Sequence, residues 1–173
     1  MHFVFLRDGM KKENSTEIFR GYFQSPLGVL GIAVEKDAVM EIFFDPKIEG
    51  RETKHPLITE TKLQLAKYFD RKLKAFDLPL KPKGSEFQIR VWNELKKIPF
   101  GKTISYLEFA RRLGDEKAIR AAASANGKNP IAVIVPCHRV IGSDGSLVGY
   151  GGGLWRKKWL IEMESGNEQQ SIF

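Results

Sequence analysis

Cysteine is almost absent from this chain: among its 173 residues only Cys137 carries a thiol. A single cysteine excludes a disulfide within the chain, and it excludes a zinc site built from several cysteines. Two interpretations of Cys137 remain, a small buried hydrophobe or a reactive nucleophile. The sequence predicts neither a metal site nor a cofactor.

Long hydrophobic runs are also absent. No apolar stretch approaches the roughly 20 residues that are needed to span a bilayer. Residues 1–17 begin with a short apolar patch and turn to charges, without the apolar core and cleavage site of a secretory signal. Together with the single cysteine, this predicts a reducing, intracellular location, cytoplasmic or, in a eukaryote, nuclear. We expect no membrane partner.

The charge of the chain is unevenly distributed. The net charge is +7 and the pI is about 9.5. Residues 1–82 carry 14 Lys and Arg against 12 Asp and Glu, whereas residues 83–173 carry 14 against 9, a net of +5. A basic half fits an anionic partner, most often a nucleic acid. An ordinary basic, soluble surface fits the charge equally well.

The first half of the chain predicts a small sheet and a helix. Three short runs rich in β-formers are separated by turn-like residues, which predicts three antiparallel strands; the runs are 19–24, 29–35 and 39–44. Apolar spacing over residues 57–69 predicts a helix. The proline- and glycine-containing segment 74–84 predicts a linker.

The second half predicts helices with defined starts. Ser85 with Gln88, and Ser105 with Glu108, have the spacing of capping boxes. Gly114 ends the second of these helices, and Asp115 can cap a third helix that reaches about Asn126. Two short helices joined through Gly114 predict a helix-turn-helix.

These patterns predict a fold of the α/β class, more closely α+β, in two domains. We expect residues 1–82 to form an N-terminal domain of a small antiparallel sheet with a helix, in which residues 1–16 are frayed. Residues 83–173 form a mostly helical C-terminal domain that contains the helix-turn-helix and the cysteine.

The third helix of the C-terminal half has unusually small side chains. Residues 121–125 read Ala-Ala-Ala-Ser-Ala, and Arg120 is the long side chain beside them. Such a helix either packs tightly on a neighbouring helix or lies against a nucleic acid groove. The two interpretations remain open from the residues alone.

The surroundings of Cys137 suit a nucleophile. The apolar, β-branched run 131–135 predicts a buried strand, which Pro136 ends, so that Cys137 lies in a turn at the strand exit. The adjacent His138 and Arg139 can supply the base or positive charge that a thiolate needs. Glu164 could orient the histidine. The alternative is an inert thiol beside a structural histidine.

A glycine-rich stretch follows the cysteine. Six glycines lie within 12 residues, with Tyr150 among them; they are Gly142, Gly145, Gly149, Gly151, Gly152 and Gly153. Glycines allow the backbone to approach a ligand closely. The Lys-Ser/Thr pair of a phosphate loop is missing. The stretch therefore predicts a pocket wall built from backbone groups.

At this point the chain resembles a known family. Pro136-Cys137-His138-Arg139-Val140 is similar to the active-site motif of the O6-alkylguanine-DNA alkyltransferases, also called methylated-DNA–protein-cysteine methyltransferases. The resemblance runs from about residue 85 to residue 164, and other matches lie in register. These are Ile104-Ser105-Tyr106 at the start of the family's helix-turn-helix, Arg120 at its arginine finger, Asn129-Pro130 at its asparagine hinge, and Gly152-Gly153-Leu154, Lys157, Trp159-Leu160 and Glu164 in its final loop and helix.

The resemblance implies a reaction. It is direct-reversal DNA repair, in which the alkyl group of O6-alkylguanine, and of O4-alkylthymine, in duplex DNA moves irreversibly to Cys137. The target base is flipped out, the displacement is of the SN2 type, and each molecule reacts once. The implied partner is double-stranded alkylated DNA, bound through its minor groove by a monomer. Residues 17–82 resemble the family's variable N-terminal domain, with a ribonuclease H-like fold, by pattern alone.

The resemblance also implies a role for individual residues. The catalytic set is Cys137 as nucleophile, His138 as base through a water, Glu164 as its orienting group, Asn129 as holder of the turn, and Tyr106 as donor to N3 of the base. The DNA-binding set is Arg120, Tyr106 and Ser143. The pocket set is Val140, Tyr150, Gly151, Gly152 and Lys157. Some members of the family carry serine at the position of Gly151, but the implied contact uses the backbone N–H.

Three other functions compete with this one. A cysteine hydrolase would have to regenerate its thiol, and nothing in the sequence marks an acyl pocket. A transcription factor would explain the helix-turn-helix and the charge, but not the thiol beside a glycine-rich wall. An alkyltransferase-like lesion binder would lack the motif cysteine, which this chain has. Activity toward alkylated DNA discriminates among all of these.

Overall fold

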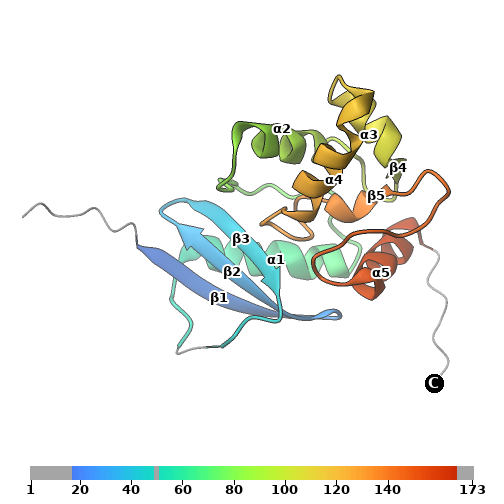
Figure 1. Cartoon of the computed structure of the whole chain (residues 1–173). Coiled ribbons are helices and arrows are strands. Elements are labelled where there is room, and N and C mark those ends of the chain that lie inside the picture. The colour runs from blue at the N-terminus through green and yellow to red at the C-terminus, as the bar shows by residue number, and fades with distance from the viewer. Residues whose placement is uncertain (1–16, 49–50, 167–173) are drawn as a thin grey trace, which may run out of the picture.

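The computed structural model of the chain describes residues 17–48 and 51–166 (Figure 1). The elements follow one another along the chain as β1 (Ile18–Ser25), β2 (Gly28–Glu35), β3 (Ala38–Phe44), α1 (Pro56–Phe69), α2 (Glu86–Leu95), β4 (Ile104–Ser105), α3 (Tyr106–Arg112), the 3-10 turn η1 (Glu116–Ala118), α4 (Ile119–Gly127), the 3-10 turn η2 (Cys137–Arg139), β5 (Val140–Ile141) and α5 (Leu154–Ser165). In the described part of the chain, no helix has the length and apolar character that crossing a membrane requires.

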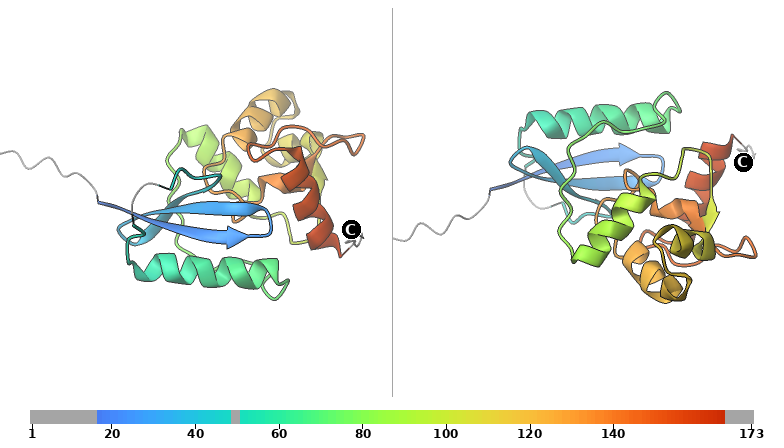
Figure 2. Two further views of the ribbon diagram at one scale, coloured as in Figure 1. Left: turned by 90° about the horizontal axis from the view of Figure 1, so that it is seen from below. Right: turned by 90° about the horizontal axis from the view of Figure 1, so that it is seen from above.

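The three predicted strands are confirmed as one antiparallel sheet in the order β1-β2-β3. The tight turns adopt left-handed backbone at Gly28 (φ 102°) and Lys36 (φ 52°). The predicted helix is also confirmed as α1, whose first turn is capped by the Nδ1 atom of His55. This helix lies along one face of the sheet (Figure 2) and buries Ile58 and Leu65 there.

The outer edge of β3 connects the two halves of the chain. The backbone N–H of Ile42 donates to the carbonyl of Pro130 at 2.9 Å, and the N–H of Ala132 donates back to Ile42 at 2.9 Å. Farther along the same edge, Val39 exchanges similar bonds with the segment around Leu80. The predicted linker therefore pairs with the sheet, and the chain that leads to Cys137 is anchored to β3.

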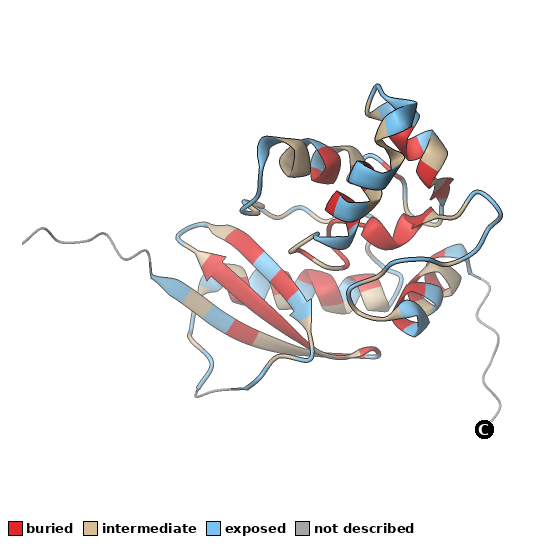
Figure 3. Ribbon diagram, viewed as in Figure 1, coloured by how far each residue is buried: buried red, intermediate tan, exposed pale blue. Residues whose placement is uncertain are grey.

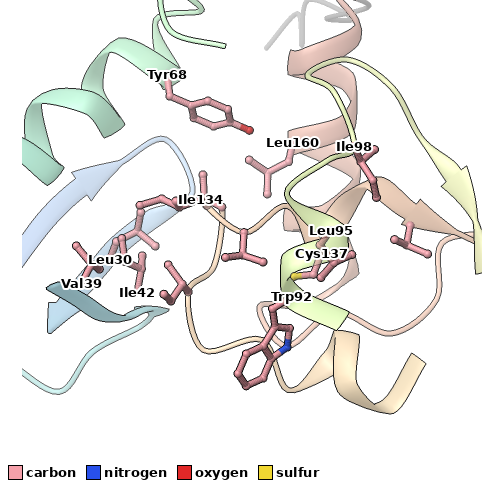
Figure 4. Packing of buried hydrophobic residues seen from close by; sticks show 14 of the residues in the cluster. Leu30, Val39, Ile42, Tyr68, Trp92, Leu95, Ile98, Ile134, Cys137 and Leu160 are labelled. Atoms are coloured by element: carbon pink, nitrogen blue, oxygen red, sulfur yellow. The ribbon is translucent and has the colours of Figure 1, made fainter. Parts of the chain in front are cut away.

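Helix α2 begins with the predicted capping box, in which Ser85 and Gln88 bond each other's backbone N–H. Its Trp92 is buried and donates from Nε1 to the carbonyl of Ala125 at 2.9 Å, which docks α2 on α4. Figure 4 shows Trp92 and Leu95 of this helix beside Cys137. The buried, small Ala122 and Ala125 let the two helices approach closely.

Helices α3 and α4 pack against each other as a helix-turn-helix, with Gly114 in left-handed backbone (φ 92°) between them. Two local predictions need correction. The third helix starts as the 3-10 turn η1, capped by Asp115, and becomes α-helical at Ile119. The second capping box is half formed, because Ser105 accepts from the N–H of Glu108 while the Glu108 carboxylate bonds Arg112.

The predicted strand over residues 131–135 is wrong. The segment is buried, but it turns back on itself: Val135 N–H donates to the carbonyl of Ile131 at 3.0 Å, and Val133 adopts φ 70°. Pairing with β3 is limited to a single bridge at Ile131, because the N–H of Ile134 bonds the carbonyl of Ala132 at 2.8 Å, and the next step of a ladder would use these two groups. Most residues of β2 and all three residues of the η2 turn are also buried (Figure 3).

Candidate active site around Cys137

Cys137 opens the η2 turn, and Asn129 holds its sulfur. The side-chain amide Nδ2 of Asn129 lies 3.2 Å from Sγ and donates to the carbonyl of Val135 at 2.8 Å. Its Oδ1 accepts from the N–H of Ile131 at 3.0 Å. One side chain therefore fixes both the backbone turn and the position of the thiol. Cys137 is 6% exposed, so it is buried but borders the cavity.

A cavity of about 410 Å³ opens at the cysteine. It is lined on one side by the end of β3 and on the other by the glycine-rich loop. The residues around it are Glu41, Ile42, Phe43, Phe44, Asp45, Gly127, Asn129, Pro130, Ala132, Cys137, Tyr150, Gly151 and Gly152. The rings of Phe44 and Tyr150 meet edge to face, 6.2 Å apart, and a Cβ at Gly152 would approach the Phe44 ring to 2.6 Å. Glycine is required there so that the loop can close on β3.

His138 is buried and bonded on one ring nitrogen. Its Nε2 atom lies 2.8 Å from Oε1 of Glu164, whereas its buried Nδ1 atom has no hydrogen-bond partner within the described structure. Burial lowers the pKa of His138 below its ordinary 6.5, although the bond to Glu164 raises it in part, so the ring is neutral at pH 7. Because a carboxylate only accepts, Nε2 carries the proton, and the free lone pair is on Nδ1.

Glu164 stays ionised although it is buried. Burial raises the pKa of this carboxyl, but the hydrogen bond of His138 and the bonds and charge of Arg139 outweigh burial and lower it well below its ordinary value. Its oxygens also accept from the hydroxyl of Tyr68 at 2.5 Å and from the N–H of Gly101 at 3.2 Å. Tyr68 comes from α1, and Figure 4 shows it pointing away from that helix toward the C-terminal half.

Arg139 does not face the sulfur, which corrects the prediction that it could supply positive charge to a thiolate. Its Nε and one terminal nitrogen bond the two oxygens of Glu164 at 2.9 and 2.8 Å, and its other terminal nitrogen donates to the carbonyl of Ile98 at 2.6 Å. The guanidinium is buried, and pairing with a carboxylate offsets much of the cost of removing it from water. Its charge therefore stabilises the ionised Glu164 carboxylate and not a thiolate.

Lys157 lies beside Tyr106, and both are near Cys137. The ammonium of Lys157 donates to the carbonyl of Val148 at 2.8 Å and lies 5.7 Å from the centre of the Tyr106 ring. Burial lowers the pKa of Lys157 to about 8, although the cysteine raises it in part. Burial raises the pKa of Cys137, whereas the bond from Asn129 and the charge of Lys157 lower it in part.

The structure brings most of the predicted pocket together, with two exceptions. Tyr150, Gly151 and Gly152 line the cavity at Cys137. Val140 does not line it, because β5 pairs with β4 and turns this side chain into the core. Lys157 does not line it either, since its stem is buried and its ammonium is held by a backbone carbonyl.

Two residues were predicted to bind DNA and to play no other role, and both lie on the surface. Arg120 is exposed on α4, and Ser143 is exposed in the loop after β5. Both are outside the cavity lining. Their exposure leaves them accessible to a macromolecule.

Sequence reasoning missed three contributors. Glu41–Asp45 at the end of β3 lines the cavity, Tyr68 bonds Glu164, and Asn126 bonds the backbone of the cysteine. A strand end, an aromatic residue on a helix and an amide in an alanine-rich helix carry no pattern that separates them from core residues. Their positions along the chain do not show that they belong to the site.

Comparison with known proteins identifies the family. The family described as 6-O-methylguanine DNA methyltransferase matches in two parts, its ribonuclease-like domain over residues 18–82 and its DNA binding domain over residues 86–166. The methylated-DNA–protein-cysteine methyltransferase of Methanosarcina acetivorans is 42% identical over 153 residues, which cover 85% of this chain and 98% of that protein. The chain belongs to this methyltransferase family.

Other relatives agree with this assignment. The constitutive methylated-DNA–protein-cysteine methyltransferase of Bacillus subtilis is 40% identical over 151 residues, covering 82% of this chain and 92% of that protein. The crystal structure of the Mycobacterium tuberculosis O6-methylguanine methyltransferase superposes with a TM-score of 0.78 at 38% identity, covering 90% and 98%. That of Mycobacterium tuberculosis OGT in complex with DNA superposes with 0.76 at 41% identity, covering 86% and 95%. The family resemblance and the α/β fold class predicted from the sequence are confirmed.

Proposed function

We propose that this protein repairs alkylated duplex DNA by moving the alkyl group of O6-alkylguanine, and of O4-alkylthymine, to Cys137. The observation that carries the proposal is the cysteine itself, which opens onto a cavity and is followed by a neutral histidine backed by an ionised glutamate. Membership of the methyltransferase family supports it. No cofactor takes part in the proposed reaction.

In the proposed reaction, the sulfur displaces the base. Nδ1 of His138 accepts the thiol proton through a water, and Glu164 stabilises the imidazolium that forms. The sulfur then forms a bond to the alkyl carbon while the bond from that carbon to O6 breaks, and the electron pair leaves with the guanine. The product is a thioether. Because a thioether offers water no leaving group, each molecule reacts once.

Guanine leaves as an anion, and donors near O6 and N3 would stabilise it. We assign the hydroxyl of Tyr106 as donor to N3 and the backbone N–H of Gly151 as donor to O6. Gly151 lines the cavity beside Cys137, and the Tyr106 hydroxyl lies close to the same glycine-rich loop, 3.4 Å from the carbonyl of Val148. Asn129 keeps the sulfur in line with the reacting carbon.

The reactive carbon of O6-alkylguanine lies inside the base stack, so the nucleotide must be flipped out. The exposed face of α4 has small side chains at Ala121 and Ser124, beside the long, exposed Arg120. Such a surface fits the minor groove, with Arg120 filling the space that the flipped base leaves and Ser143 contacting the backbone. We propose that a monomer binds in this way, in the compartment that holds the DNA.

The direct test of the proposed function is mass spectrometry after mixing the protein with duplex DNA that contains O6-methylguanine. We expect Cys137 to gain one methyl group and the DNA to lose it. An unmodified cysteine under conditions where the DNA is bound would contradict the proposal.

Replacing Arg120 by alanine should slow repair of duplex DNA by roughly 10- to 100-fold, because the unstacking that it offsets costs a few kcal/mol. Reaction with free O6-benzylguanine, which needs no flipping, should change little. Single-turnover rates on both substrates check this. Lys96→Ala, which removes an exposed charge at the end of α2, is the matched control. Equal losses on both substrates would show that Arg120 acts elsewhere.

The pH dependence should identify His138 as the base. With free O6-benzylguanine as substrate, the rate should be level above about pH 7 and should fall as the pH drops below 6.5 and His138 becomes protonated. In His138→Gln the base is lost, so the rate should instead rise about tenfold per pH unit with the thiolate fraction of Cys137, whose pKa is raised. A tenfold rise per unit in the unaltered protein would mean that a preformed thiolate attacks without His138.

A further inference from the structure

We propose that Asn126 is a positioning residue that makes the Tyr106 hydroxyl a donor toward the bound base. The inference rests on the function proposed above and adds a residue to it. Asn126 lies in the last turn of α4 and is 1% exposed. It belongs to none of the residue sets that the sequence predicted.

The amide of Asn126 bridges two parts of the site. Its Nδ2 atom lies 3.3 Å from the Tyr106 hydroxyl and 3.3 Å from the carbonyl oxygen of Cys137. The first partner opens α3 and the second lies in the η2 turn. A single NH₂ group with two hydrogens therefore links the proposed leaving-group donor to the backbone of the nucleophile.

Hydrogen-bond chemistry determines which end of the amide faces these partners. A backbone carbonyl can only accept, so the NH₂ end must face Cys137. The same nitrogen faces the Tyr106 hydroxyl, and an amide nitrogen can only donate. The hydroxyl therefore accepts from Asn126, and its own hydrogen must point elsewhere.

The other hydrogen-bond partner of this hydroxyl in the described part of the chain is a weak and shared one. The carbonyl of Val148 lies 3.4 Å from it, a long separation for an O–H donor, and the same carbonyl accepts from the ammonium of Lys157 at 2.8 Å. The hydrogen of Tyr106 is thus held only weakly inside the protein. A ring nitrogen that entered beside it would receive that hydrogen.

The bond from Asn126 also makes the hydroxyl a stronger donor. Burial raises the pKa of Tyr106, whereas this bond lowers it in part. A donor whose oxygen is itself hydrogen-bonded gives up its proton more readily, because the developing negative charge is shared.

Packing alone does not account for an amide at this position. The other buried residues of α4 are Ala122 and Ala125, and an apolar residue would fit the same environment. The Oδ1 atom of Asn126 is buried and has no partner in the described part of the chain. Burying an unsatisfied acceptor is destabilising, so the amide is retained at a cost in stability. The two hydrogen bonds that its NH₂ group donates, to Tyr106 and to Cys137, account for an amide at this position.

The test is a double-mutant cycle between Asn126 and Tyr106, read as single-turnover methyl transfer from duplex DNA. Asn126→Leu should slow transfer about tenfold, part of the loss expected when such a donor is removed outright. In the Tyr106→Phe background it should change the rate less than about twofold, because there is no hydroxyl left to orient. Asn126→Asp should slow transfer more than leucine does, because a carboxylate would take the tyrosine's hydrogen for itself.

A second substrate separates positioning from structure. In O6-methyl-3-deazaguanine a C–H replaces N3, so nothing there can accept from Tyr106. On DNA with this base, Asn126→Leu should react at the same rate as the unaltered protein. Since one variant is compared on two substrates, the fraction of folded protein is the same in both measurements and does not affect the ratio of the rates. Asn126→Ala replaces the leucine variant if the latter is insoluble. Equal losses on both substrates, or in both tyrosine backgrounds, would overturn the inference. If Cys137 of the unaltered protein gained no methyl group from the DNA, the proposed function would be overturned instead.

Discussion

Replacing Cys137 by serine or alanine is expected to abolish alkyl transfer while binding to alkylated DNA is retained. A serine hydroxyl is a far weaker nucleophile than a thiol, and His138 cannot make up the difference. The chain contains no second cysteine that could accept the group in its place. Transfer of radiolabelled methyl from duplex DNA to protein measures the loss.

Binding provides the control for this experiment. The Cys137 side chain is 6% exposed, so its removal leaves the basic surface unchanged. Affinity for alkylated duplex should therefore stay within about threefold of the unaltered protein and should fall with salt in the same way. Methyl transfer by either variant would contradict the assignment of the nucleophile. More than one methyl group per molecule of the unaltered protein would contradict the single-use reaction.

Glu164→Gln is expected to lower the free energy of unfolding by about 3–5 kcal/mol, the usual cost of breaking a buried ion pair from one side. Glutamine has the same shape but one oxygen fewer. Both oxygens of Glu164 accept from Arg139, so the amide NH₂ must face a guanidinium N–H in either orientation. His138 loses its ionised partner as well. Chemical denaturation measures the change.

The matched control for this variant lies on the same helix. Glu162 is partly exposed and pairs with Lys158 at 3.7 Å, so Glu162→Gln should cost less than about 1 kcal/mol. An equally small effect at Glu164 would show that the buried cluster does not support the fold.

The pH dependence of stability provides a further check on Glu164. Because the pKa of Glu164 is lowered on folding, its contribution is present above its ordinary value of 4.5 and is lost as the pH falls below it. The pKa of His138 is also lowered, so its contribution declines below 6.5. Stability should therefore fall from pH 7 toward pH 4, and it should fall less steeply below pH 4.5 in Glu164→Gln.

Local signals in the sequence were sufficient to predict most of the elements. Alternating β-formers and turn residues predicted the three strands, and the capping box at Ser85 predicted the start of α2, because these features depend on neighbours a few residues apart. The motif at Pro136–Val140 predicted the family for a similar reason, since the proposed nucleophile Cys137 and the proposed base His138 are adjacent in the sequence.

Features that depend on distant residues were decided only by the tertiary structure. An apolar run such as 131–135 suits a strand or any other buried segment, and here the N–H of Ile134 bonds the carbonyl of Ala132, which removes the groups that would extend a ladder. Likewise, adjacency to Cys137 did not place Arg139 near the sulfur. The buried carboxylate of Glu164, 25 residues away in the chain, attracts the guanidinium more strongly than a thiol could.

The contribution of the N-terminal half to the site was beyond sequence reasoning for the same cause. Tyr68 is 96 residues from Glu164 along the chain, and the end of β3 is similarly remote from Cys137, yet both lie at the active site. Hydrogen bonds and cavity walls form between surfaces that folding brings together, and an isolated aromatic residue or strand end carries no record of its partner. The sequence by itself determined the family and predicted Cys137 as the nucleophile, whereas the packing of the sheet against the C-terminal helices determined what surrounds Cys137.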